Sequence, residues 1–381
     1  MKTCKHFPLC GGCRYQDIPY PEQLRMKESR IKEMIDLFEL SVELKPINHY
    51  QEWFYRNKME FTFSSDEKNV LICGLHKKDK TREIFNLEEC LIFSPQAGTI
   101  LNLIREFFKE SHPPYNKFNH QGFLRHLIIR ETKTTGQLMI GLVTSTSDKL
   151  DKKAFLEKLF SLKLDHKLKS VYWIMNNRLA DAVIFENKDL LWGDPFITEK
   201  LGNLNFRIFI DCFFQTNPRG IENLYQKVQK YAGLSGKEKI FDLYCGVGSI
   251  GLFLAREARF VWGVEIKKEV VDNALVNAQL NNIDNISFIC SDVRKFLAQS
   301  DISNIDIVVI NPPRSGLSKK IKRCLLRTPP PVIFYSSCNP QSFFTDLKDF
   351  SSHYKIEFIE PFDFFPHTPH LECLALLKRF Q

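Results

Sequence analysis

Apolar side chains in the first half of the chain follow helical and then strand-like spacings. From Pro21 to Phe38 they fall near one face at helical spacing, and a proline suits the first turn of a helix. Residues 50–95 alternate apolar and polar positions instead, which is typical of strands. The pattern then continues to about Phe209 with helices at Ala97–Glu110 and Lys149–Leu162 and strands at Leu124–Thr132 and Gln137–Thr144. This order predicts an α+β domain with an antiparallel sheet.

After Asp211 the pattern changes to short apolar runs separated by helical stretches. The runs lie at Lys239–Tyr244, Phe260–Glu265, Ile286–Cys290, Asp306–Asn311 and Val332–Ser336. Such alternation is the signature of a doubly wound, mostly parallel sheet of the α/β, Rossmann-like class. The sequence therefore predicts three parts: a cysteine-rich loop and helix over residues 1–45, a central α+β domain over 46–210, and an α/β domain over 211–381.

Composition narrows the class of protein. Of the 381 residues, 44% are hydrophobic and 13% aromatic, as in an ordinary folded protein. No run of about 18 apolar residues occurs, so no membrane span is expected. The eleven cysteines are scattered, unlike the dense cysteines of a disulfide-stapled secreted domain. We therefore expect a cytoplasmic monomer whose thiols are free, catalytic or metal-bound, and the net charge of +8 favours a polyanionic partner.

A glycine-rich turn follows the first apolar run of the C-terminal part. Gly246, Gly248 and Gly251 satisfy the G-x-G-x-x-G fingerprint, in which glycine lets the backbone approach a ligand closely. This motif alone leaves NAD and S-adenosylmethionine open. Acids at successive strand ends favour S-adenosylmethionine, because its ammonium, ribose and adenine offer them partners; these acids are Asp242, Glu265 and Asp292.

The fourth run ends in Asn311-Pro312-Pro313-Arg314. The carboxyl end of a strand facing the crevice marks the reaction site in open α/β sheets. Enzymes that methylate exocyclic amines of adenine or cytosine carry a similar tetrapeptide, but its fourth residue is aromatic and stacks on the flipped base. The fourth residue here is Arg314. An amine methyltransferase of the Asn-Pro-Pro type is thus an alternative that the tetrapeptide itself disfavours.

A thiol and a carboxylate near the C-terminus fit the methylation of a carbon that is not itself nucleophilic. Cys338 follows the last parallel run, and Glu372 precedes a final apolar strand at Cys373–Leu377. A thiolate that adds to C6 of uracil makes C5 nucleophilic, and a base must later remove the C5 proton. Arg314 could lower the thiol pKa or hold the uracil carbonyls. Weaker candidates are the thiols of Cys245 and Cys324 and the bases His367 and His370.

Five motifs occur in order along nearly the whole chain: Phe213-Phe214-Gln215-Thr216-Asn217, Asp242-Leu-Tyr-Cys-Gly-Val-Gly248, Asn311-Pro-Pro-Arg314, Ser337-Cys338-Asn339 and His370-Leu-Glu372. Together they resemble the family of RNA uridine-C5 methyltransferases. The resemblance implies that Cys338 is the nucleophile and Glu372 the base. It also implies contacts with S-adenosylmethionine from Gln215, Tyr244, Glu265 and Asn311. The glycine turn adds Gly246 to this set, and the acids at strand ends add Asp242 and Asp292.

One position departs from the broad family, which usually has Asp where this chain has Asn311. The same Asn, together with Asp363-Phe-Phe-Pro-His-Thr368 and a short N-terminus, resembles the subgroup that methylates uracil 747 of 23S rRNA. The alternatives are the same chemistry at another 23S rRNA uridine or in tRNA. A non-catalytic RNA-binding protein is a further alternative, against which the intact Cys338 and Glu372 argue.

Three cysteines stand close together at the N-terminus in the pattern Cys4-x5-Cys10-x2-Cys13. Three thiolates in a short loop indicate a metal centre, and zinc and a four-iron cluster both accept four cysteines. The family resemblance implies a [4Fe-4S] cluster with Cys90 as the fourth ligand. Cys73 is the other candidate for that position. The expected role is structural, tying the N-terminal loop to the middle domain.

Basic residues and aromatics in the first part of the chain predict an RNA-binding face. Aromatic side chains would stack on unpaired bases, and basic ones would contact phosphate. The first basic group is Arg14, Arg25, Lys27, Arg30 and Lys32, and the second is Lys77, Lys78, Lys80 and Arg82. The aromatic positions are Tyr15, Trp53, Phe54 and Tyr55, followed by Arg56.

Overall fold

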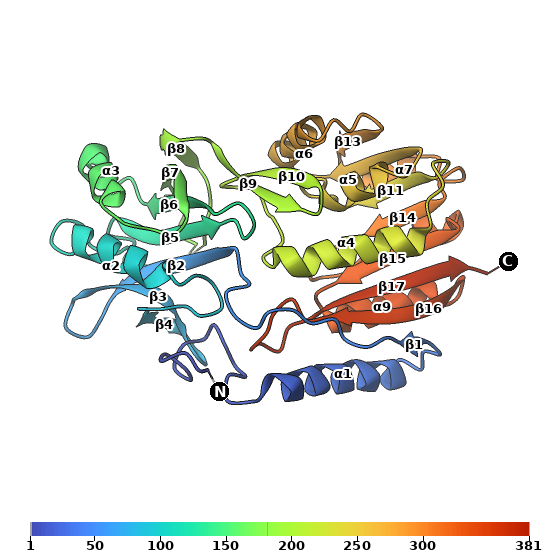
Figure 1. Ribbon diagram of the computed structural model, residues 1–381, viewed down its shortest axis with the longest axis horizontal. Coiled ribbons are helices and arrows are strands. Elements are labelled where there is room, and N and C mark those ends of the chain that lie inside the picture. The colour runs from blue at the N-terminus through green and yellow to red at the C-terminus, as the bar shows by residue number, and fades with distance from the viewer. Residues whose placement is uncertain (1, 181, 381) are drawn as a thin grey trace. The chain divides into compact units, whose positions relative to one another are not determined.

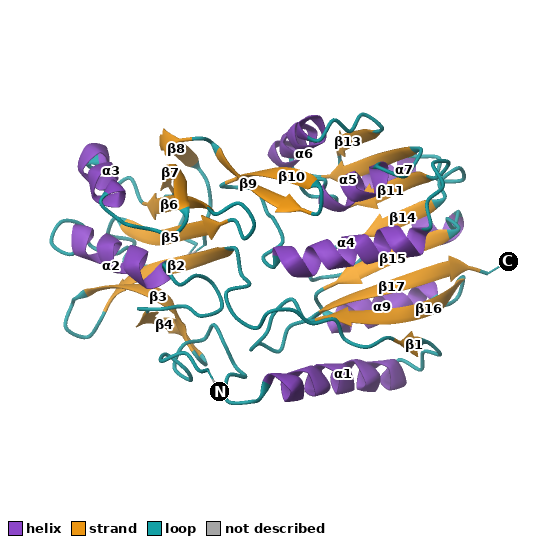
Figure 2. Ribbon diagram, viewed as in Figure 1, coloured by secondary structure: helices purple, strands orange, loops and turns teal. Residues whose placement is uncertain are grey.

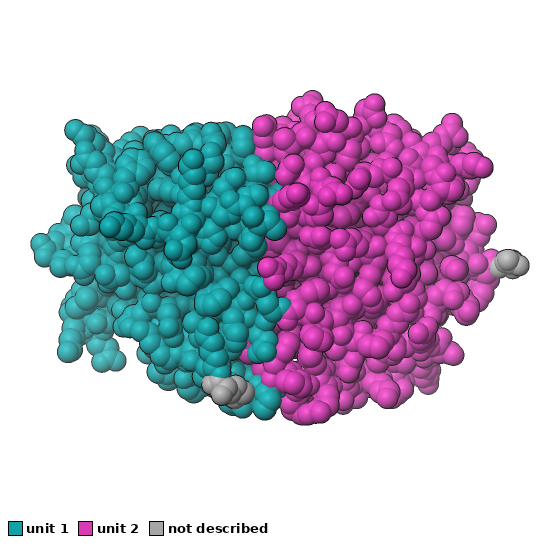
Figure 3. Space-filling view, viewed as in Figure 1, with its two compact units in different colours: residues 1–19, 51–199, 208–211 teal, residues 20–50, 200–207, 212–381 magenta. Residues whose placement is uncertain are grey.

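The structure is a computed structural model that describes residues 2–180 and 182–380. It divides into two compact units, which Figure 3 colours separately. Unit 1 contains residues 1–19, 51–199 and 208–211, and unit 2 contains residues 20–50, 200–207 and 212–381. Each unit is built around its own sheet.

Unit 1 contains a seven-stranded sheet in the order β4-β3-β2-β5-β6-β7-β8. All neighbours pair antiparallel except β6 and β7, which run parallel because helix α3 crosses between them. Helix α3 begins after Asp151, whose side chain accepts a hydrogen bond from the Ala154 amide. The bounds are β2 Lys58–Ser65, β3 Leu71–Lys77, β4 Lys80–Asn86, α2 Ala97–Phe108, β5 Leu124–Glu131, β6 Gln137–Thr144, α3 Lys152–Phe160, β7 Lys167–Met175 and β8 Asn187–Gly193.

Unit 2 contains an eight-stranded sheet in the order β1-β16-β17-β15-β14-β11-β12-β13. The strands β11 to β15 are parallel, whereas β17 pairs antiparallel with both β15 and β16. Figure 2 shows the helices of this unit against its strands. The strand bounds are β1 Glu43–Leu44, β11 Lys239–Leu243, β12 Phe260–Glu265, β13 Ile286–Cys290, β14 Ile307–Ile310, β15 Val332–Ser337, β16 Tyr354–Phe362 and β17 Glu372–Arg379.

Helices lie on both faces of this sheet, with α4 on the near face and α9 on the far face in Figure 1. The predicted α/β class is therefore confirmed. The helix bounds are α1 Tyr20–Leu37, α4 Pro218–Ala232, α5 Ser249–Ala255, α6 Lys268–Leu280, α7 Val293–Gln299, α8 Lys319–Arg327 and α9 Pro340–Phe350. A two-stranded hairpin, β9 Phe196–Leu201 with β10 Leu204–Phe209, carries the chain between the units.

Helix α1 belongs to unit 2, although the sequence predicts it as one part with the cysteine-rich loop. Its buried Ile31 and Ile35 join the hydrophobic core that includes Phe343 and Phe344 of α9. The ring of Phe38, just beyond α1, lies 5.8 Å from that of Phe344. Burial of these apolar groups draws residues 20–50 toward the C-terminal sheet, although they are far from it in sequence.

Candidate active site and cysteine pocket

Sequence-predicted site residues meet at one edge of the sheet in unit 2. Tyr244 follows β11, Asn311 follows β14, and Cys338 follows β15. These three strands are adjacent and parallel, so their carboxyl ends share one edge. Strand β17 runs antiparallel to β15, and its first residue, Glu372, therefore starts at the same edge. The topology thus brings together four residues that lie far apart in the sequence, namely Tyr244, Asn311, Cys338 and Glu372.

Glu372 is a buried carboxyl group at the start of β17. The Ser336 hydroxyl donates a hydrogen bond of 2.6 Å to Glu372 Oε1, and the side chain is almost inaccessible to solvent. Burial raises the pKa of Glu372 to about 7, and the bond from Ser336 opposes that rise. A carboxyl group with a pKa near neutrality is suited to proton transfer at physiological pH.

Cys338 is half-buried beside two charged groups. Burial raises the pKa of its thiol, and the charge of Glu372 raises that pKa further. A hydrogen bond and the charge of Arg314 act in the opposite direction. The sequence-based expectation for Arg314 therefore has the right sign, but burial outweighs the guanidinium and leaves the thiol pKa above its ordinary value.

The loop that carries Arg314 is fastened to the start of α9. The Arg314 carbonyl accepts hydrogen bonds from Asn339 Nδ2 at 2.7 Å and from the Ser342 hydroxyl at 3.1 Å. Asn339 also caps α9 by accepting a bond from the Gln341 amide. Asn339, the residue after Cys338, thus holds Arg314 in place, and the charge of Arg314 acts on the Cys338 thiol.

The buried carboxylate of Asp346 also binds this loop. Asp346 of α9 accepts hydrogen bonds from the Leu317 amide at 2.8 Å, the Tyr335 hydroxyl at 2.6 Å and Lys322 Nζ at 2.7 Å. A buried ion pair with further hydrogen bonds to satisfy it fixes geometry more than it adds stability. This hub links α8, α9 and β15 to the turn after Arg314.

The glycine turn between β11 and α5 has the features of a ligand cradle. Asp242 is fully buried, and its Oδ2 accepts a hydrogen bond of 3.1 Å from the Gly251 amide. Its Oδ1 is buried without a hydrogen-bond partner among the described residues. Gly246 has φ +54, and a Cβ there would meet nothing within 4 Å. Burial raises the pKa of Asp242 to about 8. An orphaned carboxyl oxygen beside an open turn fits the polar groups of S-adenosylmethionine.

The other predicted cofactor residues follow neighbouring strands. Glu265 ends β12, and its Oε1 accepts bonds from the amides of Ile266 and Lys267. Asp292 caps α7 after β13 by accepting a bond from the Lys295 amide. Tyr244 has a left-handed φ of +62. The remaining predicted residue, half-buried in the segment between β10 and α4, is Gln215.

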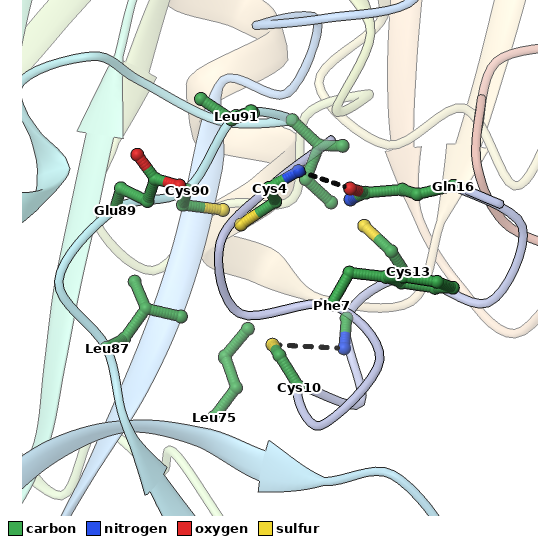
Figure 4. A pocket seen from close by; sticks show the side chains of 12 residues that line it. Cys4, Phe7, Cys10, Cys13, Gln16, Leu75, Leu87, Glu89, Cys90 and Leu91 are labelled. Atoms are coloured by element: carbon green, nitrogen blue, oxygen red, sulfur yellow. Dashed lines mark hydrogen bonds between the residues drawn. The ribbon is translucent and has the colours of Figure 1, made fainter. Parts of the chain in front are cut away.

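The predicted metal-ligating cysteines of unit 1 line one pocket (Figure 4). Cys4, Cys10 and Cys13 lie in the N-terminal loop, and Cys90 follows β4. The cavity between them is small, with a volume of about 20 Å³. Its other lining side chains are mainly apolar, and Leu75, Leu87 and Leu91 are among them. The alternative ligand, Cys73, is fully buried and does not line the pocket.

The N-terminal loop is fastened to the segment around Cys90 by hydrogen bonds. His6 Nε2 accepts bonds from the amides of Glu88 at 3.0 Å and Glu89 at 3.3 Å. Because both donors are backbone N–H groups, neutral His6 carries its proton on Nδ1. Glu89 in turn accepts a bond from the Lys5 amide, and Cys4 donates its amide to Gln16.

The side chains of the cysteine pocket are not arranged around a single metal ion. In residues 2–180 and 182–380, no three or more His, Cys, Asp or Glu side chains are grouped so as to hold one metal ion. The described residues therefore do not show the metal centre that the cysteine pattern predicts. A four-iron cluster makes a different demand, because each cysteine binds a different iron and the sulfurs surround a volume.

Two residues of the predicted RNA-binding face are buried, which corrects that part of the prediction. Lys27 of α1 pairs with Asp363 inside unit 2, and Tyr55 is only 1% exposed. Helical periodicity alone does not show that the polar side of α1 covers a loop. Of the other basic residues, Arg14 pairs with Asp79, and a surface carboxylate at Glu83 accepts bonds from Lys77 and Lys80.

The second-ranked catalytic candidates occupy less suitable places. The Cys245 thiol is buried in the glycine turn, and burial raises its pKa strongly. Cys324 lies within α8. His367 is buried against Gln23 of α1, and burial lowers its pKa to about 4. The His370 ring lies 6.2 Å from that of Phe365.

Two functional contacts escape sequence reasoning. Ser336 directly precedes the Ser337-Cys338-Asn339 motif, but nothing in its sequence neighbourhood shows that its hydroxyl binds Glu372, 36 residues away. The polar face of α1 likewise binds the loop before Glu372, more than 300 residues along the chain. Long-range polar pairing of this kind leaves no local periodic signal.

Comparison with known proteins shows the family of this chain. The profile of the tRNA (uracil-5-)-methyltransferase family matches residues 19–380. An uncharacterized RNA methyltransferase of Caldanaerobacter subterraneus is 38% identical over 99% of this chain and 84% of its own length. An uncharacterized RNA methyltransferase of Clostridium tetani is 36% identical, with 99% and 83% covered.

A solved structure is similar over the same span. It is the crystal structure of the Pyrococcus abyssi tRNA (uracil-54, C5)-methyltransferase in complex with S-adenosyl-L-homocysteine. The TM-score is 0.77 and the sequence identity 30%, over 99% of this chain and 88% of that one. Separately, none of the helices in the described part of the chain is both long and apolar enough to cross a membrane.

Proposed function

As a member of the tRNA (uracil-5-)-methyltransferase family, this chain is an RNA uracil-C5 methyltransferase, and we propose that it methylates one uridine of 23S rRNA, at position 747, in the cytoplasm. The observation that carries the chemistry is the meeting of Cys338 and Glu372 at one sheet edge. The choice of 23S rRNA is supported by Asn311 and by the segment from Asp363 to Thr368.

The proposed reaction uses these two groups in sequence. The Cys338 thiolate adds to C6 of the target uracil, and C5 gains carbanion character. C5 then takes the methyl group from S-adenosylmethionine. Glu372 removes the remaining C5 proton, the C5–C6 double bond re-forms, and the C6–S bond breaks to release Cys338. Each bond made to the enzyme is therefore broken within one turnover.

The electrostatics of the site suit this order of steps. Arg314 stabilises the thiolate that must form first, against the effects of burial and of Glu372. Glu372 has a pKa of about 7, so a large share of it is ionised at neutral pH and ready to accept the C5 proton. The hydrogen bond from Ser336 fixes one oxygen of that base.

The methyl donor fits the glycine turn at the same edge. We assign S-adenosylmethionine to Gln215, Asp242, Tyr244, Gly246, Glu265, Asp292 and Asn311. The orphaned Asp242 Oδ1 and the open turn at Gly246 support this assignment. The donor supplies an electrophilic methyl group. The amide of Asn311, unlike the family's usual Asp, offers hydrogen bonds but no charge.

We assign the cysteine pocket to a [4Fe-4S] cluster held by Cys4, Cys10, Cys13 and Cys90. Their shared apolar pocket supports this assignment, and the exclusion of Cys73 from the lining supports Cys90 as the fourth ligand. A cluster there would join the N-terminal loop to the segment after β4 and would serve a structural role. The enzyme is proposed to act as a monomer.

Tritium release from C5-labelled uridine in unmodified 23S rRNA tests the chemistry. With S-adenosylmethionine present, the native protein should release tritium, whereas Cys338→Ala should release none. Cys324→Ala, which removes a thiol from α8 away from the proposed chemistry, should behave like the native protein. Methyl transfer without tritium loss would move the product to a nitrogen, as for an amine methyltransferase, and overturn the mechanism.

The substrate is tested by the same assay on separate RNAs. Equal amounts of unmodified 23S rRNA and unmodified tRNA should give release from the rRNA alone, and nuclease mapping should place the methyl group at uridine 747. Release from tRNA, or at another rRNA uridine, would overturn the choice of substrate and leave the uracil-C5 chemistry intact.

A further inference from the structure

One face of α1 is bound to the loop that leads into Glu372. The loop covers residues 363–371, between β16 and β17. Four side chains of α1 donate to it or pair with it, at 2.7–3.2 Å for the closest atoms, and they are Tyr20, Gln23, Lys27 and Arg30. Their spacing of three, four and three residues places them on one helix face.

The centre of this contact is a fully buried ion pair. Lys27 Nζ lies 2.7 Å from Asp363 Oδ1, and both side chains are almost inaccessible to solvent. Lys27 Nζ also donates to the Phe365 carbonyl at 3.1 Å, and the Tyr20 hydroxyl donates to Asp363 Oδ2. A buried, hydrogen-bonded charge pair fixes one arrangement of the groups it joins.

Gln23 and Arg30 hold the part of the loop that leads into Glu372. Gln23 Oε1 accepts a bond of 2.9 Å from the His367 amide, and Gln23 Nε2 lies 3.1 Å from His367 Nδ1. Arg30 donates to the Pro369 carbonyl, three residues before Glu372. His367 has a left-handed φ of +64, a conformation that the surrounding contacts must maintain.

From these contacts we propose that α1 is a positioning element for Glu372, acting through the loop 363–371. This inference rests on the proposed function, in which Glu372 removes the C5 proton. Its consequence is specific to one step, because proton removal follows thiol addition and methyl transfer. Loosening α1 should therefore leave the methylated Cys338–RNA adduct intact for longer, rather than prevent its formation.

The test is Gln23→Ala, which removes both bonds to His367 without leaving an unpaired charge. The matched control is Glu33→Ala, an exposed position on the same helix. Single-turnover reactions with C5-tritiated 23S rRNA measure the rate at which a denaturation-stable adduct forms and the rate at which tritium is released. We expect adduct formation at the native rate and tritium release slowed on the order of tenfold or more in Gln23→Ala.

A second variant guards against misfolding. Lys27→Met with Asp363→Asn replaces the buried pair without leaving a lone charge, and should show the same split between adduct formation and decay. Native decay rates in both variants, or equal slowing of formation and decay, would overturn the role of α1. If the native protein forms no Cys338-dependent adduct, the proposed function fails instead, and the two failures are thereby distinguished.

Discussion

The cysteine pocket of unit 1 and the Cys338 site of unit 2 place the same functional group in different surroundings. Burial raises the pKa of Cys4, Cys10, Cys13 and Cys90, and their mutual repulsion raises that of Cys90 further. Cys338 is also buried in part, but a guanidinium lies beside it. Burial thus raises the thiol pKa in both sites, and at Cys338 a hydrogen bond and the charge of Arg314 oppose that rise.

The two sites also differ in how the chain builds them. The pocket depends on one loop that must be fastened to a segment about 80 residues away, through His6 and Glu89. The catalytic edge depends on the ends of neighbouring strands, which parallel topology places together. Separate variants in the two sites should thus have separable effects.

The largest expected effect is that turnover and iron content are lost separately, each through a variant in a different site. Cys338→Ala should abolish turnover and leave the iron content unchanged, whereas Cys90→Ala should lose most of the iron. Iron analysis and tritium release on anaerobically purified protein measure both. Cys73→Ala is the matched control: it removes a buried thiol outside the pocket and should retain iron and turnover. Iron loss in Cys73→Ala with retention in Cys90→Ala would reverse the ligand assignment.

The next effect concerns the base. Glu372→Gln should slow turnover by about 10²–10⁴-fold, the usual range for loss of a general base. Adduct formation should persist, because removal of the carboxylate also removes its repulsion of the Cys338 thiolate. Gel analysis of the denatured reaction should show the accumulating adduct. The half-buried Glu357 of β16 gives a control, and Glu357→Gln should turn over normally. Normal tritium release from Glu372→Gln would assign the base elsewhere.

A smaller effect is expected when the charge of Arg314, which acts on the Cys338 thiol, is removed. Arg314→Gln should raise the pKa of Cys338 further, because the guanidinium opposes burial there. Adduct formation near neutral pH should slow by roughly 10-fold, the effect of one pKa unit on the thiolate fraction, and the deficit should shrink as pH rises. Arg323→Gln, at an exposed position in α8, should match the native pH profile. A pH-independent deficit would indicate that Arg314 binds RNA and does not act on the thiol.

The same contrast separates what sequence reasoning could predict from what it could not. The apolar runs Lys239–Tyr244, Asp306–Asn311 and Val332–Ser336 predict parallel strands, and topology then places their carboxyl ends together. The sequence does not show that α1 packs in unit 2, since an apolar stripe at Ile31 and Ile35 fits either sheet. Nor does it show the burial of Lys27, because a lysine on a helix is ordinarily solvated.

The smallest expected effect is on stability, and it follows from the raised pKa of Glu372. The pKa is about 7 in the folded protein and 4.5 for the ordinary group, so the folded state holds this proton more tightly. The contribution of the Glu372 proton to the free energy of unfolding is therefore fully present below pH 4.5, and it is lost as pH rises toward 7. Above pH 7 the native fold bears the full cost of a buried carboxylate, about 3 kcal/mol for a shift of this size.

Glu372→Gln removes that cost and should therefore unfold at higher denaturant concentration than the native protein at pH 8, with the difference vanishing near pH 4. Denaturant titrations at the two pH values measure the free energy of unfolding in each case. Glu357→Gln should show no such pH-dependent gain. A Glu372→Gln protein no more stable than the native one at pH 8 would mean that Glu372 is better solvated or better paired than its burial indicates. Burial would then not hold the pKa of Glu372 near 7. The contrast with the cysteine pocket would in that case depend on Arg314 alone.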